Sequence, residues 1–141
     1  MQHISRKGKE EKRKWILSNA TELIFEHGFD AVSMDQIAQK AEISKGSLYT
    51  YFKSKIDLYL SIGMEGERIL HQQMSSTFST HVNGLEILQG MSQVFVDFVH
   101  NYSGYFDAML YFDNQSIFHQ IKDADLLDAC MDQGQVTLNF I

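Results

Sequence analysis

Proline is absent from all 141 residues of the chain, although average usage of about 5% would place roughly seven prolines in a chain of this length. Proline commonly marks the turns of sandwiches and barrels and stiffens extended linkers, so its absence favours helices. The length corresponds to one domain or two small lobes, and it is sufficient to bury an apolar core. The sequence therefore predicts an all-α fold.

Cysteine usage and hydropathy exclude two classes of protein. The lone cysteine, Cys130, cannot form an internal disulfide, which excludes a disulfide scaffold of the secreted type. No apolar stretch approaches the ~18 residues of a membrane span, and the basic start of the chain leads into no apolar region of a signal peptide. We therefore expect a soluble, cytoplasmic protein without a membrane partner.

The formal net charge of −6 is distributed unevenly along the chain. Residues 1–60 contain ten Lys or Arg against eight Asp or Glu, whereas residues 61–141 contain two against ten. The basic residues of the first part form an amino-terminal arm (Arg6, Lys7, Lys9, Lys12, Arg13 and Lys14) and a second cluster (Lys40, Lys45, Lys53 and Lys55). Both groups would suit phosphate, whose neutralisation drives affinity for nucleic acids, although a basic run at a terminus is equally typical of a solvated tail.

Local signals predict a series of helices in the first half of the chain. Apolar periodicity predicts a helix over residues 12–27, which Gly28 is expected to end in the left-handed conformation, with Phe29 packing against Ile24. Serines at N-cap positions begin the next three helices: Ser33 for residues 34–41, Ser44 for residues 44–52, and Ser54 for a long helix to about residue 74. Gln36 and Asp57 complete capping boxes with the first and last of these serines.

The signals are weaker in the second half. A polar stretch over residues 75–83 is expected to follow the long helix. Further helices are expected over residues 84–102, over residues 105–118 after a break at Gly104, and from residue 123 to the end. We place the boundary between the lobes inside the long helix, near residues 63–66, and divide the chain into residues 1–55 and 56–141.

Two short, capped helices joined by a tight turn are typical of a helix-turn-helix, whose second helix enters a major groove of DNA. In that second helix Leu48 and Phe52 share one face, so Gly46, Ser47 and Thr50 are expected to point away from the core. Lysines at the starts of two helices would be unfavourable at the positive end of the helix dipole unless a phosphate binds there.

Residues 16–59, and above all the run ISKGSLYTYFKSK at residues 43–55, resemble the DNA-binding domain of TetR-type transcriptional regulators. One departure is Glu42, where the family usually has glycine; either Glu42 accepts a strained backbone or the turn differs slightly. The resemblance implies a homodimer whose recognition helices enter successive major grooves of a palindromic operator, ~34–36 Å apart. By position, it implies phosphate contacts for Ser33, Ser44, Lys45, Tyr51 and Lys55, and base-edge contacts for Gly46, Ser47, Tyr49 and Thr50.

The resemblance also implies an effector pocket in the second lobe, a helical domain for effector binding and dimerisation. Candidate lining residues are Phe95, Phe98, Tyr102, Tyr105, Phe106, Met109, Phe112 and Phe118, and candidate polar groups are His100, Asn101, Asp107, Asp113 and His119. Each aromatic could equally pack a helical core. We expect a small, lipophilic effector that releases a repressor from its operator; aromatics beside acids would suit a cationic one.

Two other functions stay open as alternatives: a helical interaction module that has lost operator binding, and a metal-dependent enzyme. The sequence contains no HExxH, CxxC, glycine-rich phosphate loop or nucleophile elbow, and offers only the pairs His71 with His81 and Asp97 with His100 as metal ligands. No metal or other cofactor is predicted. The last helix shows no stop signal at Ile141, whereas family members usually continue into helices that form the dimer interface. The chain is thus expected to be truncated, or to dimerise through its final helices.

Overall fold

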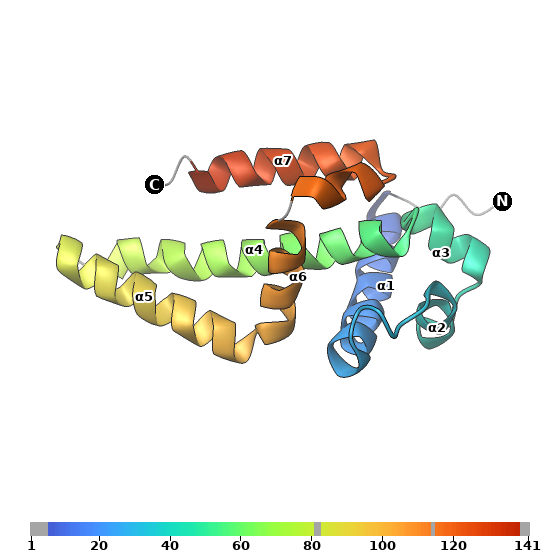
Figure 1. Ribbon diagram of the computed structural model, residues 1–141, viewed down its shortest axis with the longest axis horizontal. Helices are drawn as coiled ribbons and strands as arrows, with labels where there is room; N and C mark the ends of the chain where they lie inside the picture. Colours follow the sequence, from blue (N-terminus) through green and yellow to red (C-terminus); the bar gives the residue numbers. More distant parts are fainter. Residues whose placement is uncertain (1–5, 81–82, 114, 139–141) are drawn as a thin grey trace.

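The computed structural model describes residues 6–80, 83–113 and 115–138, with side chains over residues 8–80, 83–112 and 118–133. These residues form seven α-helices and one 3-10 helix, without a strand (Figure 1). The helices are α1 (Arg6–His27), α2 (Met34–Lys40), α3 (Lys45–Tyr51), α4 (Lys55–Thr80), α5 (Gly84–Asn101), α6 (Ser103–Asp113), the 3-10 helix η1 (Gln115–Gln120) and α7 (Ala124–Leu138). The predicted all-α fold is confirmed.

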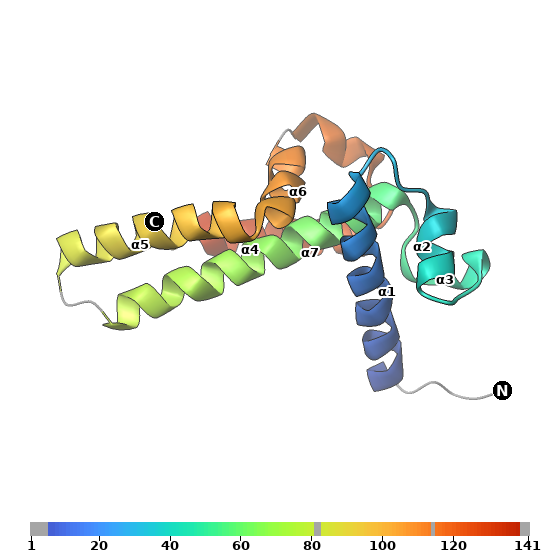
Figure 2. The ribbon, with the colours of Figure 1, turned by 90° about the horizontal axis from the view of Figure 1, so that it is seen from below.

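The helices are arranged around α4, which runs along the molecule (Figure 1, Figure 2). Helix α1 crosses α4 near its amino-terminal end, and α2 and α3 lie beyond that crossing. Helix α5 runs back beside the distal part of α4, α6 crosses α4, and α7 lies along α4 on another side. We call α1–α3 the head, and α5–α7 with the distal part of α4 the body. Among the described residues, no helix is both long and apolar enough to cross a membrane.

The head is built on an apolar core to which each of its helices contributes one face. Its buried members include Ile16, Ala20 and Ile24 of α1, Met34, Ile37 and Ala38 of α2, and Leu48 and Phe52 at α3. Burial of an aliphatic or aromatic side chain of this size contributes roughly 1.5–3 kcal/mol, so this cluster orients the three helices. The predicted short helices over residues 34–41 and 44–52 are confirmed to within one residue.

Helix α1 differs from its prediction at the start and agrees with it at the end. It begins at Arg6 rather than near residue 12, because Lys, Glu and Arg are good helix formers and continue the helix without apolar periodicity. It ends at Gly28, which has a φ of +87° and donates its N–H to the Ile24 carbonyl oxygen (2.8 Å). The predicted left-handed stop is therefore confirmed.

Side-chain caps fix the starts of the short helices. The Ser33 Oγ accepts the Gln36 N–H (3.2 Å), and the Gln36 side-chain oxygen accepts the Ser33 N–H (2.8 Å), which completes the predicted capping box. The Ser44 Oγ accepts the Ser47 N–H (3.1 Å) at the start of α3. These bonds satisfy donors that a helix leaves unpaired in its first turn.

The turn between α2 and α3 is closed by Glu42 in the left-handed conformation, with a φ of 57°. Its N–H donates to the Gln39 carbonyl oxygen (3.1 Å), and the next N–H, from Ile43, donates to the Ala38 carbonyl oxygen (3.0 Å). These two bonds form a Schellman motif, whose left-handed position favours glycine. Of the two possibilities left by the sequence, the strained backbone at Glu42 is the one observed.

The start of α4 is tied to a distant part of the chain by Asp57, which is 1% exposed. The Ser54 Oγ accepts the Asp57 N–H (3.1 Å), and the Ser54 hydroxyl donates to the Asp57 carboxylate, so the predicted cap is confirmed. The Asp57 Oδ1 also accepts the N–H groups of Lys122 (2.9 Å) and Asp123 (3.0 Å), in the turn before α7. These bonds offset the cost of burying the carboxylate and join α4 to α7.

Three predicted helix boundaries in the body are wrong. Helix α4 continues through the polar stretch to Thr80 rather than ending near residue 74. The hydroxyls of Ser79 and Thr80 donate to carbonyls one turn earlier, so these side chains are satisfied within the helix and do not act as caps that end it. The break before α6 lies at Tyr102 rather than at Gly104. Helix α6 ends at Asp113, and η1 replaces the last part of the helix predicted to reach residue 118.

The remaining boundaries agree with the prediction. Helix α5 ends one residue before the predicted residue 102. Helix α7 begins after Asp123, whose Oδ1 accepts the Leu126 N–H (3.2 Å). Residues 139–141, at the end of the predicted last helix, lie outside the described residues.

Glycines allow α4 and α6 to approach closely where they cross. A Cβ added at Gly63 would lie 3.3 Å from the Ala108 carbonyl oxygen, and one added at Gly66 would lie 2.9 Å from the Tyr105 Cβ. A Cβ at Gly66 would force a neighbouring atom to shift, and one at Gly63 would make a tight contact with the α6 backbone, so glycine suits the close packing here. Gly63 and Gly66, near which we placed the boundary between the lobes, thus lie in the contact that joins α6 to α4.

Candidate nucleic-acid interface

Helix α3 presents an exposed face of small and hydroxylated residues. Gly46 and Thr50 are exposed, Tyr49 is 41% exposed and Ser47 is half-buried. The Thr50 Oγ1 donates to the Gly46 carbonyl oxygen (3.1 Å). A Cβ added at Gly46 would meet no atom within 4 Å. The fold itself therefore does not require glycine at this position, in contrast to Gly63 and Gly66.

The predicted phosphate contacts at Ser33 and Ser44 lie at helix starts, where their hydroxyls already serve as caps. Lys45 lies at the start of α3, and its ammonium is 2.9 Å from the Asp35 carboxylate of α2. The hydrogen bond and charge of Asp35 raise the pKa of Lys45. The ammonium is thus charged, exposed and available to exchange its carboxylate partner for a phosphate.

Lys55 has a structural role that sequence reasoning missed. Its Nζ donates to the carbonyl oxygens of Phe29 (2.8 Å) and Val32 (3.0 Å) and lies 4.4 Å from the centroid of the Phe29 ring. Lys55 therefore holds the loop between α1 and α2 against the start of α4. An ammonium group has three N–H donors, and two of them are used here. The predicted phosphate contact of Lys55 would use the third donor and stays a prediction.

The basic arm divides in the structure. The Arg13 guanidinium donates to the Ser61 Oγ (3.0 Å) and lies 4.6 Å from the centroid of the Phe52 ring. Burial lowers the pKa of Arg13, an effect that Asp123 opposes. Arg13 thus joins α1 to α4 instead of facing solvent as part of a tail, while Lys12 lies 5.9 Å from the ring centroid of Tyr51, a predicted phosphate contact.

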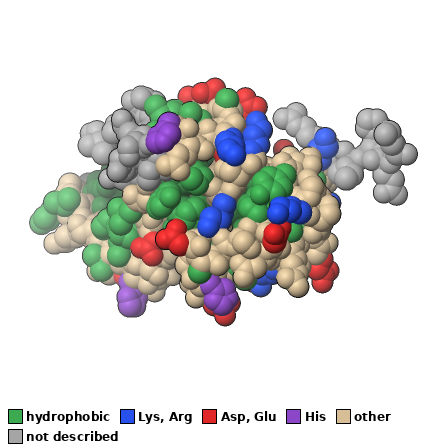
Figure 3. All heavy atoms as spheres, turned by 45° about the vertical axis from the view of Figure 1, so that its right-hand side comes forward, with side chains coloured by type: hydrophobic (Ala, Val, Ile, Leu, Met, Phe, Trp, Pro, Cys, Tyr) green, Lys and Arg blue, Asp and Glu red, His purple; other side chains and the backbone are tan. Residues whose placement is uncertain are grey.

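Further cations lie on the face of the molecule that Figure 3 shows. Figure 3 turns the head end of Figure 1 forward, and Lys and Arg side chains are spread over the central and right-hand parts of that face. Lys9 and Lys14 of the arm are exposed, and the side chains of Arg6 and Lys7 lie outside the described ones. This surface combines the uncharged face of α3 with cations around it, an arrangement that suits base edges flanked by phosphates.

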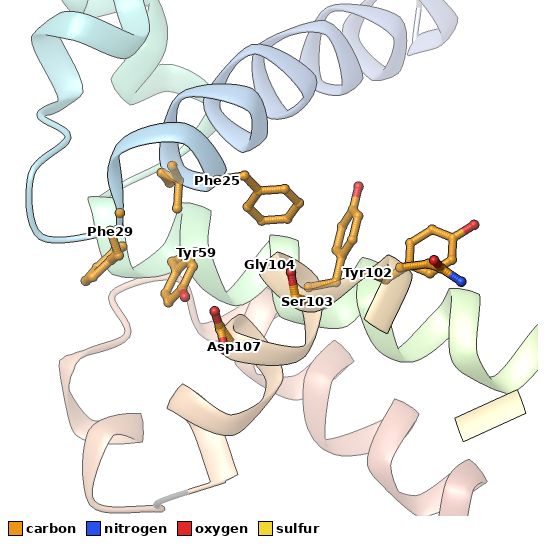
Figure 4. Close-up of a pocket in the computed structure, with 11 residues that line it drawn as sticks. Phe25, Phe29, Tyr59, Tyr102, Ser103, Gly104 and Asp107 are labelled. Carbon is orange, nitrogen blue, oxygen red and sulfur yellow. The ribbon is translucent and has the colours of Figure 1, made fainter. Parts of the chain in front are cut away.

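A pocket of about 310 Å³ lies where the head meets the body (Figure 4). Its lining residues are Ile24, Phe25, Gly28 and Phe29 at the end of α1, Tyr59 of α4, and Asn101, Tyr102, Ser103, Gly104, Tyr105 and Asp107 where α5 turns into α6. Two of the predicted lining residues, Tyr102 and Tyr105, and two of the candidate polar groups, Asn101 and Asp107, are brought together here. The contributions from α1 and α4 were missed, because no local pattern brings segments this far apart in sequence together.

The other six predicted lining residues pack elsewhere in the body. Phe98 is buried and stacks on Tyr102 at 5.4 Å, and Phe95 meets Phe106 edge to face at 5.9 Å. The other three are Phe112, which is buried 5.8 Å from the Tyr59 ring, Met109, which lies beside Gly66, and Phe118, which is half-buried against the core. The side chain of Asp113, a candidate polar group, lies outside the described ones.

Tyr59 is the most strongly perturbed titratable group of the pocket. Burial, with a further contribution from Asp107, raises the pKa of Tyr59 to about 12. Figure 4 shows the Asp107 side chain of α6 directed toward the Tyr59 ring of α4. The phenol is therefore a neutral hydrogen-bonding group at physiological pH.

Metal ligands are not clustered in the part of the chain that the structure describes: no three His, Cys, Asp or Glu side chains there are placed to hold one ion. Of the candidate ligands, His81 lies outside the described residues. Asp97, on α5, accepts a hydrogen bond from the Gln93 side chain (2.9 Å).

The chain is similar in sequence to known regulatory proteins. Residues 16–62 match the family model described as bacterial regulatory proteins, tetR family. The HTH-type transcriptional activator FasR of Mycolicibacterium smegmatis is 31% identical over 130 residues, which cover 88% of this chain and 57% of FasR. The HTH-type transcriptional repressor KstR of the same organism is 42% identical over 60 residues, which cover 42% of this chain and 29% of KstR.

Solved structures share the fold at lower sequence identity. AibR in complex with isovaleryl coenzyme A and operator DNA has a TM-score of 0.66 and 20% identity, over 92% of this chain and 67% of that one. The ketosteroid transcriptional regulator KstR2 of Mycobacterium tuberculosis has a TM-score of 0.63 and 20% identity, over 91% of this chain and 63% of that one. The chain thus spans less than two thirds of the length of its curated relatives FasR and KstR.

Proposed function

Because the chain belongs to the TetR family of bacterial regulatory proteins, we propose that it regulates transcription by binding double-stranded operator DNA through α3. In this proposal Gly46, Ser47, Tyr49 and Thr50 approach base edges, and Ser33, Ser44, Lys45, Tyr51 and Lys55 bind phosphates. Hydroxyl groups can hydrogen-bond to the edges of different bases, and an aromatic ring can contact thymine methyl groups. We therefore expect each of these residues to discriminate only weakly between base pairs.

The observation that carries the proposal is the exposed glycine of α3. Glycine lowers helix stability by up to about 1 kcal/mol relative to alanine, and at Gly46, the second residue of α3, no neighbouring atom within 4 Å requires it. Glycine at this position would allow another molecule to approach the helix backbone closely, because it has no side chain. Lys45, the neighbouring residue, supplies the charge that an approaching phosphate needs.

We further propose that two copies bind a palindromic operator, because a two-fold operator matches a two-fold dimer. The dimer represses by occupying the operator, and a small, lipophilic effector releases it by favouring an arrangement of head and body that fits the operator less well. Helix α4 belongs to both parts, so it is the element that transmits the change. Reciprocity then requires operator DNA to weaken effector binding by the same factor.

The experiment is a fluorescence-anisotropy titration of DNA from upstream of the chain's own gene, at several stated salt concentrations. The expected result is tight binding to that fragment and much weaker binding to a scrambled one. Lys45→Ala should lower the salt slope by about one unit and weaken binding to both fragments alike, because one phosphate contact is lost. Arg68→Ala is the matched control, since Arg68 lies on the body, paired with Glu65 (2.7 Å).

Equal affinity for the two fragments would refute operator binding. Equal salt slopes for Lys45→Ala and the unaltered chain would refute the role of Lys45. A reporter driven by the same upstream region then separates repression from activation, since loss of a repressor raises its expression.

A further inference from the structure

We propose that the pocket between the head and the body is a binding site for a small organic cation, such as a quaternary ammonium compound. The site differs from the proposed DNA surface, because it is formed by the end of α1, Tyr59 of α4 and the corner between α5 and α6. Binding of the cation does not depend on the proposed function; only its effect on DNA binding does.

The walls of the pocket are aromatic and are supplied from both sides. From the head, the Phe25 ring meets the Tyr105 ring edge to face, with centroids 4.9 Å apart. From the body, Tyr102 lies 6.3 Å from Tyr105. The electron-rich faces of such rings attract cations, and ammonium groups with apolar substituents also gain from burial against them. The volume of about 310 Å³ is sufficient for a small ligand of this type.

The charge of the lining residues favours a positively charged ligand. Among the described residues that line the pocket, Asp107 is the only charged one, and no Lys or Arg lines it. Two cations that lie near lining residues are already engaged: Lys55, beside Phe29, donates to two backbone carbonyl oxygens, and Arg68, near Tyr105, is paired with Glu65. An anionic ligand would therefore meet a carboxylate without a compensating cation, whereas a cationic ligand would meet it favourably.

The head side of the pocket is held in place by a glycine of α6. A Cβ added at Gly104 would lie 2.6 Å from atoms of the Phe25 ring, so the ring lies directly against the α6 backbone. Figure 4 shows Phe25 and Gly104 facing each other across the junction of α1 and α6. A ligand seated between these walls contacts both head and body, so its binding favours one arrangement of the two over others.

The test uses benzyltrimethylammonium titrated into the full chain without DNA, followed by NMR. Saturable binding is expected, with upfield shifts of the N-methyl protons, because aromatic rings shield a cation that lies over their faces. Benzyl alcohol and benzoate serve as the neutral and anionic probes and should bind at least about tenfold more weakly. Equal binding of the neutral or anionic probe, or no saturable binding of the cation, overturns the proposal.

Two variants locate the site. Asp107→Asn keeps the shape of the side chain and removes its charge, so it should weaken binding of the cation by about tenfold and leave binding of benzyl alcohol unchanged. The control is Asp128→Asn, which makes the same charge change at an exposed residue of α7. Gly104→Ala should displace the Phe25 ring and so also weaken binding of the cation. Gly84→Ala should leave this binding unchanged, because a Cβ at Gly84 meets nothing within 4 Å. Unchanged cation affinity in both Asp107→Asn and Gly104→Ala overturns the placement.

The effect on DNA is measured separately, by repeating the anisotropy titration with saturating benzyltrimethylammonium. A change in operator affinity that Asp107→Asn abolishes is the expected result. A chain that binds the cation but no operator refutes the proposed function and leaves the cation site in place. A chain that binds operator but not the cation refutes only the site.

Discussion

The head and the body fix their helices by contacts of different range. In the head, the N-caps of α2 and α3 come from serines three residues before the N–H groups they accept. In the body, the turn before α7 depends on Asp57, whose carboxylate accepts the N–H groups of Lys122 and Asp123 from 65 and 66 residues away. The helix starts of the head are thus set largely by local sequence, whereas the turn before α7 needs the chain to close over a long distance.

Glycine is used differently in α3 and where α4 crosses α6. Gly46, in the head, faces open space, whereas Gly63 and Gly66 lie against the backbone or side chains of α6. A glycine that packs contributes to stability, because a larger residue would force the helices apart. A glycine in a helix that touches nothing contributes no packing and lowers helix stability relative to alanine.

The largest expected effect is at the long-range contact. Asp57→Ala should lower the free energy of unfolding by about 3 kcal/mol, because it removes the acceptor of two N–H groups and the cap of α4. Urea denaturation followed by circular dichroism measures the loss. Asp57→Asn keeps one acceptor oxygen and should lose about half as much. A loss below about 1 kcal/mol for Asp57→Ala would show that the contact does not hold the turn before α7.

The next effect concerns the packed glycine. Gly66→Ala should destabilise the chain by about 2 kcal/mol, because the added methyl group would lie 2.9 Å from the Tyr105 Cβ and overpacking outweighs the gain in helix propensity. Thermal denaturation measures the change. An increase in stability would show that α4 and α6 can separate at no cost.

The exposed glycine should respond in the opposite direction. Gly46→Ala should raise the free energy of unfolding by up to about 1 kcal/mol, through helix propensity alone, and weaken operator binding by about tenfold or more, because the methyl group obstructs close approach of DNA. The same denaturation and anisotropy measurements report both changes. Unchanged operator affinity in a stabilised variant would remove Gly46 from the proposed interface.

The same difference in range explains how much the sequence could predict. The caps at Ser33 and Ser44 and the stop at Gly28 depend on neighbouring residues, and all three are confirmed. The break assigned to Gly104 is wrong, because that glycine is needed for contact with Phe25, which lies 79 positions earlier in the chain. The sequence alone could not show such a neighbour.

In the candidate interface and the pocket, too, local contacts could be predicted from the sequence and long-range contacts could not. The residues of α3 could be assigned to an exposed face from helical periodicity, because Leu48 and Phe52 identify the buried side. Periodicity could not show that Lys55 bonds to the loop after α1. Nor could it show that Tyr59 completes a pocket with residues of the α5–α6 corner. Both depend on how segments meet after the core has formed.

The smallest expected effect concerns Glu42, a residue with a side chain in a backbone conformation that favours glycine. Glu42 has a φ of 57° in a Schellman motif, a conformation that costs a residue with a side chain about 1 kcal/mol more than glycine. Glu42→Gly removes that cost but makes the unfolded chain more flexible, so a net gain of about 0.5 kcal/mol in the free energy of unfolding is expected. Glu42→Ala is the matched control: it removes the same side chain but keeps a Cβ in the left-handed region, so it should show no gain. An equal gain in both variants would mean that the Glu42 carboxylate, rather than its backbone conformation, lowers the stability of the head.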